Sequence, residues 1–167
     1  MESLLDKKTK ANLTEAIGHE LYAHSLYKNL ANYMQKVGFF GTREYFLSES
    51  EDELKHYQIL VDYINDRGDV ADIPAVQKQA DKPTTLMDAF EIVYEAEYEL
   101  LKFYTKIYEE AEDEMEDCVT SQFLLQFLEI QRKAVGEVKD ILALLKIAGS
   151  DAGALLLADK QIKKWGK

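Results

Sequence analysis

The sequence contains few of the residues that interrupt helices or form cross-links. Its 167 residues include one cysteine, two prolines, eight glycines and three histidines. The single cysteine, Cys118, excludes an internal disulfide and a cysteine-rich zinc site. Because proline and glycine are the residues that break regular structure, their scarcity favours long helices and predicts an all-α protein.

Long apolar runs and an excess of basic residues are also missing. No segment reaches the roughly 18 consecutive apolar residues that a membrane-spanning helix needs, and the residues after Met1 show no apolar stretch typical of a signal peptide. The formal net charge of −11 disfavours binding to nucleic acid, whose phosphates require a basic surface. We therefore expect a cytoplasmic protein that binds neither membranes nor nucleic acid.

Apolar residues recur at three- and four-residue spacing in four long segments, which predicts four amphipathic helices. The segments cover about residues 10–36, 42–67, 85–114 and 120–147. Asn12 or Thr14 is the expected cap of the first helix, and Thr84 or Thr85 is the expected cap of the third. The acidic stretch Glu109 to Asp117, which ends the third helix, is either a solvated terminus or an ion-attracting mouth.

Two further segments complete the expected architecture. Residues 69–85 hold both prolines and no helical period, and roughly twelve extended residues cover the ~39 Å length of a ~26-residue helix. This connection can therefore run the length of the bundle, which places the second and third helices parallel. Residues 152–164 predict a short fifth helix that packs on the bundle or on other copies of the chain. We expect one domain, residues 1–167, with the bundle at about residues 10–147.

Each of the four long helices has a polar interruption in its apolar stripe, near mid-length. The interruptions are Glu20, Glu53 with His56, Glu97 and Gln131. Residues three apart project from one side of a helix, so Glu53 and His56 point the same way. Taken alone, that pair also fits a Glu–His contact on a helix surface. The whole set is better explained as a shared site for a cation such as iron, manganese or zinc, because a buried carboxylate without a partner is costly.

Along its whole length the chain resembles the non-haem ferritins, which are iron-storage shells of 24 subunits. Six motifs carry the resemblance in order and spacing: His19-Glu20-Leu21-Tyr22, Leu26-Tyr27, Ser50 to His56, Tyr94-Glu95-Ala96-Glu97, Gln131-Arg132-Lys133-Ala134 and Ala158-Asp159-Lys160. The resemblance implies a ferritin-like four-helix bundle, with a long crossover between the second and third helices and a short fifth C-terminal helix.

The resemblance also implies a di-iron ferroxidase site that takes two iron ions per subunit. Glu20, Glu53 and His56 match the ligands of the first iron, and Glu53 matches the carboxylate that bridges the two ions. Glu97 and Gln131 match the surroundings of the second iron.

The implied function is iron storage and detoxification. Fe(II) would be oxidised by dioxygen or peroxide, and Fe(III) mineral would be stored inside a homo-oligomer of 24 chains. Glu53 and Tyr27 are the residues implied in catalysis. Tyr27 would hydrogen-bond a ligand or supply an electron, or it is simply a core tyrosine. The alternative function is a structural shell, or a partner in a shell, whose degenerate metal site does not oxidise iron.

Several residues depart from the related families. The fourth helix lacks the second Glu-x-x-His motif of rubrerythrins and bacterioferritins, so the expected site is asymmetric. Many bacterial ferritins have a third iron site built from acids, but Ile130, Lys133 and Ala134 stand at those positions and only Asp52 remains. We therefore expect no dedicated third site. His24, on the Glu20 side of the first helix, is either an extra ligand or a supporting core residue.

Overall fold

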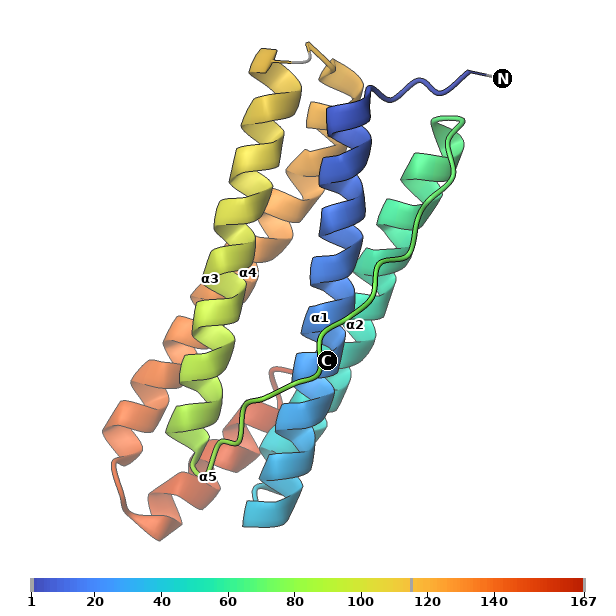
Figure 1. Cartoon of the computed structure of the whole chain (residues 1–167). Helices are drawn as coiled ribbons and strands as arrows, with labels where there is room; N and C mark the ends of the chain where they lie inside the picture. Colours follow the sequence, from blue (N-terminus) through green and yellow to red (C-terminus); the bar gives the residue numbers. More distant parts are fainter. Residues whose placement is uncertain (1, 115, 167) are drawn as a thin grey trace.

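The computed structural model describes residues 2–114 and 116–166, and within them it contains helices and no strands. The elements are α1 (Lys7–Val37), α2 (Phe40–Asp66), α3 (Leu86–Glu109), a π-helical segment η1 (Glu110–Glu114), α4 (Cys118–Ala148) and α5 (Ala152–Lys163). Four long helices form a bundle, and α5 lies at the end where α2 begins (Figure 1). The predicted all-α bundle with a short fifth helix is confirmed. The predicted domain also includes residues 1, 115 and 167, which lie outside the described residues.

The start of α1 was predicted wrongly, because its cap lies before the apolar pattern begins. Asp6 is the N-cap, and its carboxylate accepts hydrogen bonds from the backbone N–H groups of Lys8 (2.8 Å) and Thr9 (3.0 Å). Asn12, an expected cap, lies inside the helix and donates to Glu110 instead, at 2.7 Å. The helix ends at Gly38, whose φ of 91° is the left-handed conformation that favours glycine.

The crossover between α2 and α3 runs along α1, as predicted from its length. Three contacts at the start, middle and end of α1 establish this course. Lys10 pairs with Asp69 at 2.6 Å, Gly18 lies against Pro74, and Asn29 donates to the carbonyl of Asp81 at 2.9 Å. Because the connection returns to the end where α2 began, α2 and α3 are parallel, and α1 is antiparallel to both (Figure 1).

The ends of α3 and α4 have clear local causes. Thr85 caps α3 in a capping box with Asp88, which confirms one of the two caps expected there. The helix proper stops at Glu109, and the rest of the predicted segment is the wider π-helical turn η1. Asp117 caps α4 by accepting from the N–H of Thr120, so α4 starts two residues earlier than predicted.

The acidic stretch after α3 holds ion pairs to the first helix. Lys8 lies 3.6 Å from Glu110 and 2.5 Å from Glu114. These pairs tie the far end of α3 to the beginning of α1. Both acids therefore have a basic partner, and the side chain of Glu114 stays 57% exposed.

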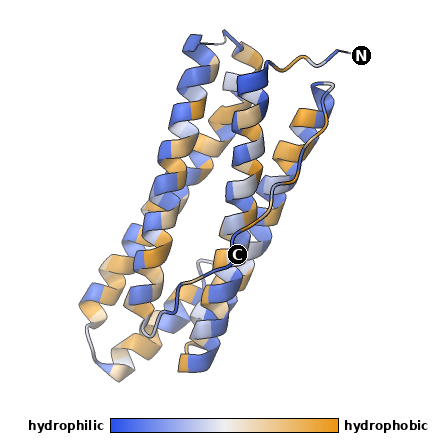
Figure 2. Cartoon of the chain, viewed as in Figure 1, coloured by the Kyte–Doolittle hydropathy of each residue, from blue (hydrophilic) through white to orange (hydrophobic). Residues whose placement is uncertain are grey.

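The apolar core is divided into two clusters by a polar layer. One cluster contains Leu26 to Met34 of α1 with Phe46 and Val138, and the other contains Leu13 to Ile17 of α1 with Leu60. Apolar and polar residues alternate along every long helix, as the amphipathic pattern requires (Figure 2). The predicted polar interruptions lie between the two clusters, at the middle of the bundle.

The fifth helix is joined to α2 by a carboxylate. Asp159 accepts hydrogen bonds from the backbone N–H groups of Gly41 (2.8 Å) and Thr42 (2.6 Å), at the start of α2. The N-cap residue of α2, Phe39, makes no side-chain cap of its own. Asp159 therefore satisfies donors that α2 leaves unpaired. Among the described residues, no helix is both long and apolar enough to cross a membrane.

Candidate metal centre

Five polar side chains from four helices meet in the layer between the two apolar clusters. Four of them, Glu20, Glu53, Glu97 and Gln131, are only 0–4% exposed, and His56 is 17% exposed at its side chain. Packing of the apolar residues on either side forces these polar groups inward, because they share a helix face with the core. All five are residues for which the sequence predicts a metal site, and their role as ligands stays a prediction.

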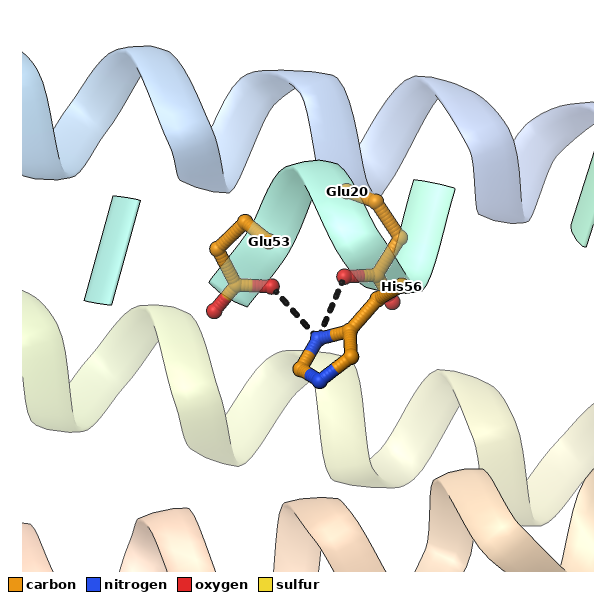
Figure 3. A group of neighbouring side chains, drawn as sticks. All are labelled: Glu20, Glu53 and His56. Carbon is orange, nitrogen blue, oxygen red and sulfur yellow. Dashed lines mark hydrogen bonds and ion pairs between the residues drawn. The ribbon is translucent and has the colours of Figure 1, made fainter. Parts of the chain in front are cut away.

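Glu20, Glu53 and His56 form the tightest group (Figure 3). His56 Nδ1 lies 3.0 Å from Glu53 Oε2 and 3.4 Å from Glu20 Oε2. One ligand atom from each residue falls within 4.8 Å of the others, which is a spacing that a single cation can bridge. The one-turn offset between Glu53 and His56 on α2 presents both side chains toward Glu20 on α1.

Glu97 is held by two hydrogen bonds on the other side of the layer. The Tyr27 hydroxyl donates to Glu97 Oε1 at 2.5 Å, and Gln131 Nε2 donates to Glu97 Oε2 at 2.7 Å. Gln131 uses its amide nitrogen here, so its oxygen is left available for another partner. The predicted residues of the second position are therefore together, with Tyr27 as a hydrogen-bond donor to one of them.

A second tyrosine, Tyr104, was missed by the sequence interpretation. Its hydroxyl donates a short hydrogen bond to Glu20 Oε1, and both residues are fully buried. The arrangement mirrors the one around Glu97. Glu20 and Tyr27 are seven residues apart on α1, and Glu97 and Tyr104 are seven apart on α3. Because the two helices are antiparallel, each tyrosine reaches the glutamate of the other helix, and the repeated spacing was the signal available in the sequence.

The three buried carboxylates differ in acidity. Burial, together with the charges of Glu20 and Glu97, raises the pKa of Glu53 well above its usual value. Burial also raises the pKa of Glu97, although the hydrogen bonds from Tyr27 and Gln131 act against it. For Glu20, burial is outweighed by the nearby His56 and Glu53 and by the hydrogen bond from Tyr104, and its pKa is lowered. This environment therefore disfavours three negative charges in the layer when no cation is present.

The group is short of positive charge. Within residues 2–114 and 116–166, no lysine or arginine forms an ion pair with Glu20, Glu53 or Glu97, and His56 is the one basic side chain in contact. Glu20 Oε2 is buried and has no hydrogen-bond partner. Buried carboxylates are retained in proteins when they are paired or coordinate a metal. The donor set, hard oxygens with one imidazole nitrogen, fits iron and similar divalent cations.

Glu49 is a further acidic residue that the sequence interpretation did not single out. It lies one turn before Glu53, and burial with the charges of Glu137 and Asp52 raises its pKa to about 8. Glu137 itself accepts a hydrogen bond from the Tyr45 hydroxyl at 2.7 Å. These residues extend the polar layer between α2 and α4.

The structure also locates His24, the possible extra ligand, and Asp52 and Lys133, which stand at the positions of a third iron site in other ferritins. His24 Nδ1 lies 2.7 Å from the carbonyl oxygen of Ser50, so this nitrogen donates to the backbone of α2 and is not free to bind a metal. Asp52 pairs with Lys55 at 2.5 Å. Lys133 pairs with Glu129 at 3.4 Å. In the described parts of the chain, one group of three or more histidine, cysteine, aspartate or glutamate side chains is close enough to share an ion. It consists of Glu20, Glu53 and His56.

A bundle with one long crossover and an acid-rich centre shared by four helices defines a ferritin-like protein. The sequence model of the ferritin-like domain family matches residues 10–148, and the chain belongs to this family. The expected family is confirmed, and the family binds iron.

Relatives described as non-haem ferritins cover almost the full chain. A bacterial non-haem ferritin of Staphylococcus aureus (strain USA300) is 27% identical over 95% of this chain and 95% of its own. One from Bacteroides fragilis (strain 638R) is 27% identical over 95% and 98%. Among solved structures, an open-pore ferritin from the hyperthermophilic archaeon Archaeoglobus fulgidus has a TM-score of 0.92 at 28% identity, covering 95% of this chain and 98% of that one. An engineered closed form of that ferritin has a TM-score of 0.91 at 29% identity, covering 95% and 96%.

Proposed function

We propose that the chain oxidises Fe(II) at the buried polar layer and stores the Fe(III) product as mineral inside a shell of 24 copies. The observation that carries the proposal is the group Glu20, Glu53 and His56, which is buried, short of positive charge and close enough to share one ion. The iron-binding family to which the chain belongs supports iron as that ion.

Two Fe(II) ions are the substrates, and Glu53 is the carboxylate common to both. The first ion binds Glu20, Glu53 and His56, where Glu20 Oε2 accepts no hydrogen bond and lies 3.4 Å from His56 Nδ1. The second binds Glu53, Glu97 and the free amide oxygen of Gln131. Carboxylate oxygens stabilise Fe(III) more than Fe(II), because a hard ligand favours the higher charge.

The redox step balances with dioxygen as the oxidant. Each Fe(II) gives one electron, and dioxygen takes two electrons and two protons to leave as hydrogen peroxide. Peroxide is the alternative two-electron oxidant and leaves as water. Glu53 and Glu97 have raised pKa values and must be ionised to bind a metal ion, so iron binding is expected to release protons. Tyr27 orients Glu97 through the 2.5 Å hydrogen bond, and the raised pKa of its buried hydroxyl keeps it a donor.

The second position is the weaker one, and this asymmetry suits a storage protein. It has oxygen donors alone, whereas the first has an imidazole nitrogen. A product ion leaves a weakly binding position more readily, so we infer that Fe(III) departs from the Glu97 side toward the mineral. The same asymmetry underlies the alternative function, a structural shell whose incomplete site does not oxidise iron.

Assembly is proposed from the exposed apolar residues near the tail. Leu156 and Leu157 of α5 are 53% and 69% exposed, and Ile147 at the end of α4 is 86% exposed. Such a patch is normally covered by a partner, and further copies of the chain are the proposed partner. We place the shell in the cytoplasm, where the single Cys118 would stay reduced.

Stopped-flow oxidation after anaerobic addition of Fe(II), combined with the particle mass, tests the proposal. Wild-type protein should oxidise Fe(II) rapidly in a particle of 24 chains, and Glu53→Ala should lose the fast phase. The matched control is Glu51→Ala, an exposed carboxylate on the same helix, which should oxidise normally. A wild-type rate in Glu53→Ala would refute the site. Slow wild-type oxidation in an intact 24-chain particle would instead favour the structural alternative.

A further inference from the structure

A groove between α1 and α3 reaches the metal centre from the outside of the bundle. It has a volume of about 480 Å³, and its lining residues include Tyr27 and Glu97, which are 2% and 3% exposed. The groove therefore touches the two residues joined by the 2.5 Å hydrogen bond, on the side of the second iron position. It arises because α1 packs mainly on α2 and α3 mainly on α4, so the seam between the two pairs is loosely filled.

The walls of the groove are mostly apolar. They consist of side chains from both helices: Tyr22, Ala23, Leu26, Val93, Ala96, Leu100 and Phe103. The carboxylate of Glu97 is directed into the bundle by its hydrogen bonds to Tyr27 and Gln131. A hydrated cation in such a groove would lose water without gaining ligands along the walls, which is unfavourable.

Two lysines and a histidine stand at the rim of the groove. Lys102 and Lys106 line it, with side chains 52% and 70% exposed. His19 lies there too, against the ring of Phe103 at 4.5 Å between centroids. Glu99 also lines the rim and pairs with Lys102, and Lys106 lies 3.9 Å from Glu110. The rim therefore offers a divalent cation no excess of negative charge, although the chain as a whole has a net charge of −11.

We propose that this groove admits dioxygen to the metal centre, so that the oxidant and the iron arrive by different routes. The inference rests on the proposed function and specifies how the apolar substrate reaches that same site. Dioxygen is small, uncharged and apolar, so it loses little on leaving water and is not repelled by lysines. It arrives beside Glu97, a carboxylate of the second iron position.

Xenon pressurisation of crystals tests the route without any turnover, because xenon occupies apolar cavities as dioxygen does. Metal-free wild-type crystals should show xenon between Ala96 and Leu26. In Ala96→Phe, a ring placed in the groove should remove the xenon peak. The matched control is Ala143→Phe, the same change at an exposed position of α4 outside this groove, and it should retain the peak. Absence of xenon from the wild-type groove would overturn the proposal.

Kinetics at varied dioxygen give the second readout. For Ala96→Phe, the KM for dioxygen should rise on the order of tenfold while the rate at saturating dioxygen changes little. Anaerobic Co(II) binding should be unchanged, which separates a blocked route from a damaged site. Ala23→Phe, which narrows the same groove from α1, serves if Ala96→Phe does not fold.

The outcomes separate the two proposals. If the wild type shows xenon in the groove but oxidises no Fe(II), the proposed function fails and the groove is an apolar cavity without that role. If the wild type oxidises Fe(II) and both groove variants keep the wild-type dioxygen dependence, the route is wrong and the function stands. If Lys102→Glu or Lys106→Glu lowers the KM for Fe(II), iron uses the groove and the proposal of separate routes is overturned.

Discussion

Helices α1 and α3 are alike at the centre of the bundle, whereas α2 and α4 differ. Glu20 on α1 and Glu97 on α3 each accept a hydrogen bond from a tyrosine of the other helix. On α2, Glu53 is followed one turn later by His56, but on α4 the corresponding residue after Gln131 is Ala134. The α1–α2 pair therefore completes a three-residue group, and the α3–α4 pair does not.

The residues that orient the carboxylates are therefore arranged alike on the two sides of the layer, whereas the residues expected to bind metal are not. The two Glu–Tyr hydrogen bonds orient one carboxylate on each side of the layer, so the geometry is nearly symmetric. The ligands that complete each side are not. We therefore expect one strongly binding and one weakly binding position, although the hydrogen-bonded framework is alike on both sides.

The largest effect is expected from His56→Ala, which makes the α1–α2 side resemble the other. Losing a supporting partner alone costs roughly 10–100-fold in metal affinity, so losing a ligand should cost more than about 100-fold at the first position. Anaerobic Co(II) titration followed by absorbance measures it. His19→Ala, which removes a histidine outside the group, is the matched control. Unchanged affinity in His56→Ala would show that His56 is not a ligand.

Removing either tyrosine hydroxyl should weaken one side and spare the other. Tyr104→Phe leaves Glu20 Oε1 without its donor, and Tyr27→Phe does the same to Glu97 Oε1. We expect roughly tenfold weaker Co(II) binding at the first position in Tyr104→Phe and at the second in Tyr27→Phe. Tyr98→Phe, at an exposed tyrosine, should change neither. Equal losses at both positions in each variant would contradict the separate assignment.

Restoring the missing ligand should strengthen the second position. Ala134→His places an imidazole one turn after Gln131, as His56 follows Glu53, and should tighten the second Co(II) by about tenfold. Both wild type and variant should saturate at two ions per chain, because Asp52 and Lys133 offer no third group. Ala143→His is the control on the same helix. A third tightly bound ion in the wild type would show the stoichiometry to be wrong.

The smallest effect concerns pH and involves Glu49. The folded protein keeps the proton of Glu49 up to about pH 8, whereas an ordinary glutamate loses it near 4.5. Since the folded state binds more protons in this interval, stability of the metal-free protein falls as pH rises from 5 to 8. Glu53 and Glu97 act in the same direction, because their pKa values are also raised.

Glu49→Gln should reduce this pH dependence without removing it. Thermal unfolding of the chelator-treated protein at several pH values measures the slope, and the variant should gain on the order of a few degrees in Tm at pH 8 relative to pH 6. Glu95→Gln, an exposed carboxylate on α3, is the control and should follow the wild type. A slope that is the same in all three proteins would exclude Glu49 as a contributor.

The sequence predicted the elements best where a signal is local. Thr85 and Asp88 are three residues apart and form the capping box that starts α3. The crossover was also predictable, because its prolines and lack of period are read directly from the chain. The start of α1 was not, since Asp6 precedes the apolar pattern and the helix extends beyond the part that is buried.

In the candidate site, the glutamates and Gln131 could be predicted because each is a polar residue in an apolar stripe. The hydrogen bond made by Tyr104 could not be predicted in this way. Glu97 and Gln131 stand out because burial of such groups requires a reason. Tyr104 belongs in an apolar stripe by its ring, so nothing in its own helix shows that its hydroxyl faces Glu20. That contact depends on the register between antiparallel α1 and α3, which only the folded structure supplies. The groove is equally non-local, since its walls come from both helices.

The carboxylate of Asp159 links α5 to the candidate metal centre indirectly, although α5 does not contribute a side chain to that centre. It completes the first turn of α2, and α2 is the helix that carries Glu53 and His56. Gly41 belongs to this joint, because a Cβ there would collide with the Asp159 backbone. In a chain whose α5 has not docked, the backbone N–H groups of Gly41 and Thr42 at the start of α2 therefore lack this partner. In the proposed shell, neighbouring copies that hold α5 in place would also stabilise the helix of the proposed metal centre. Assembly and metal binding would then be coupled, and an isolated subunit would bind iron less well than the assembled form.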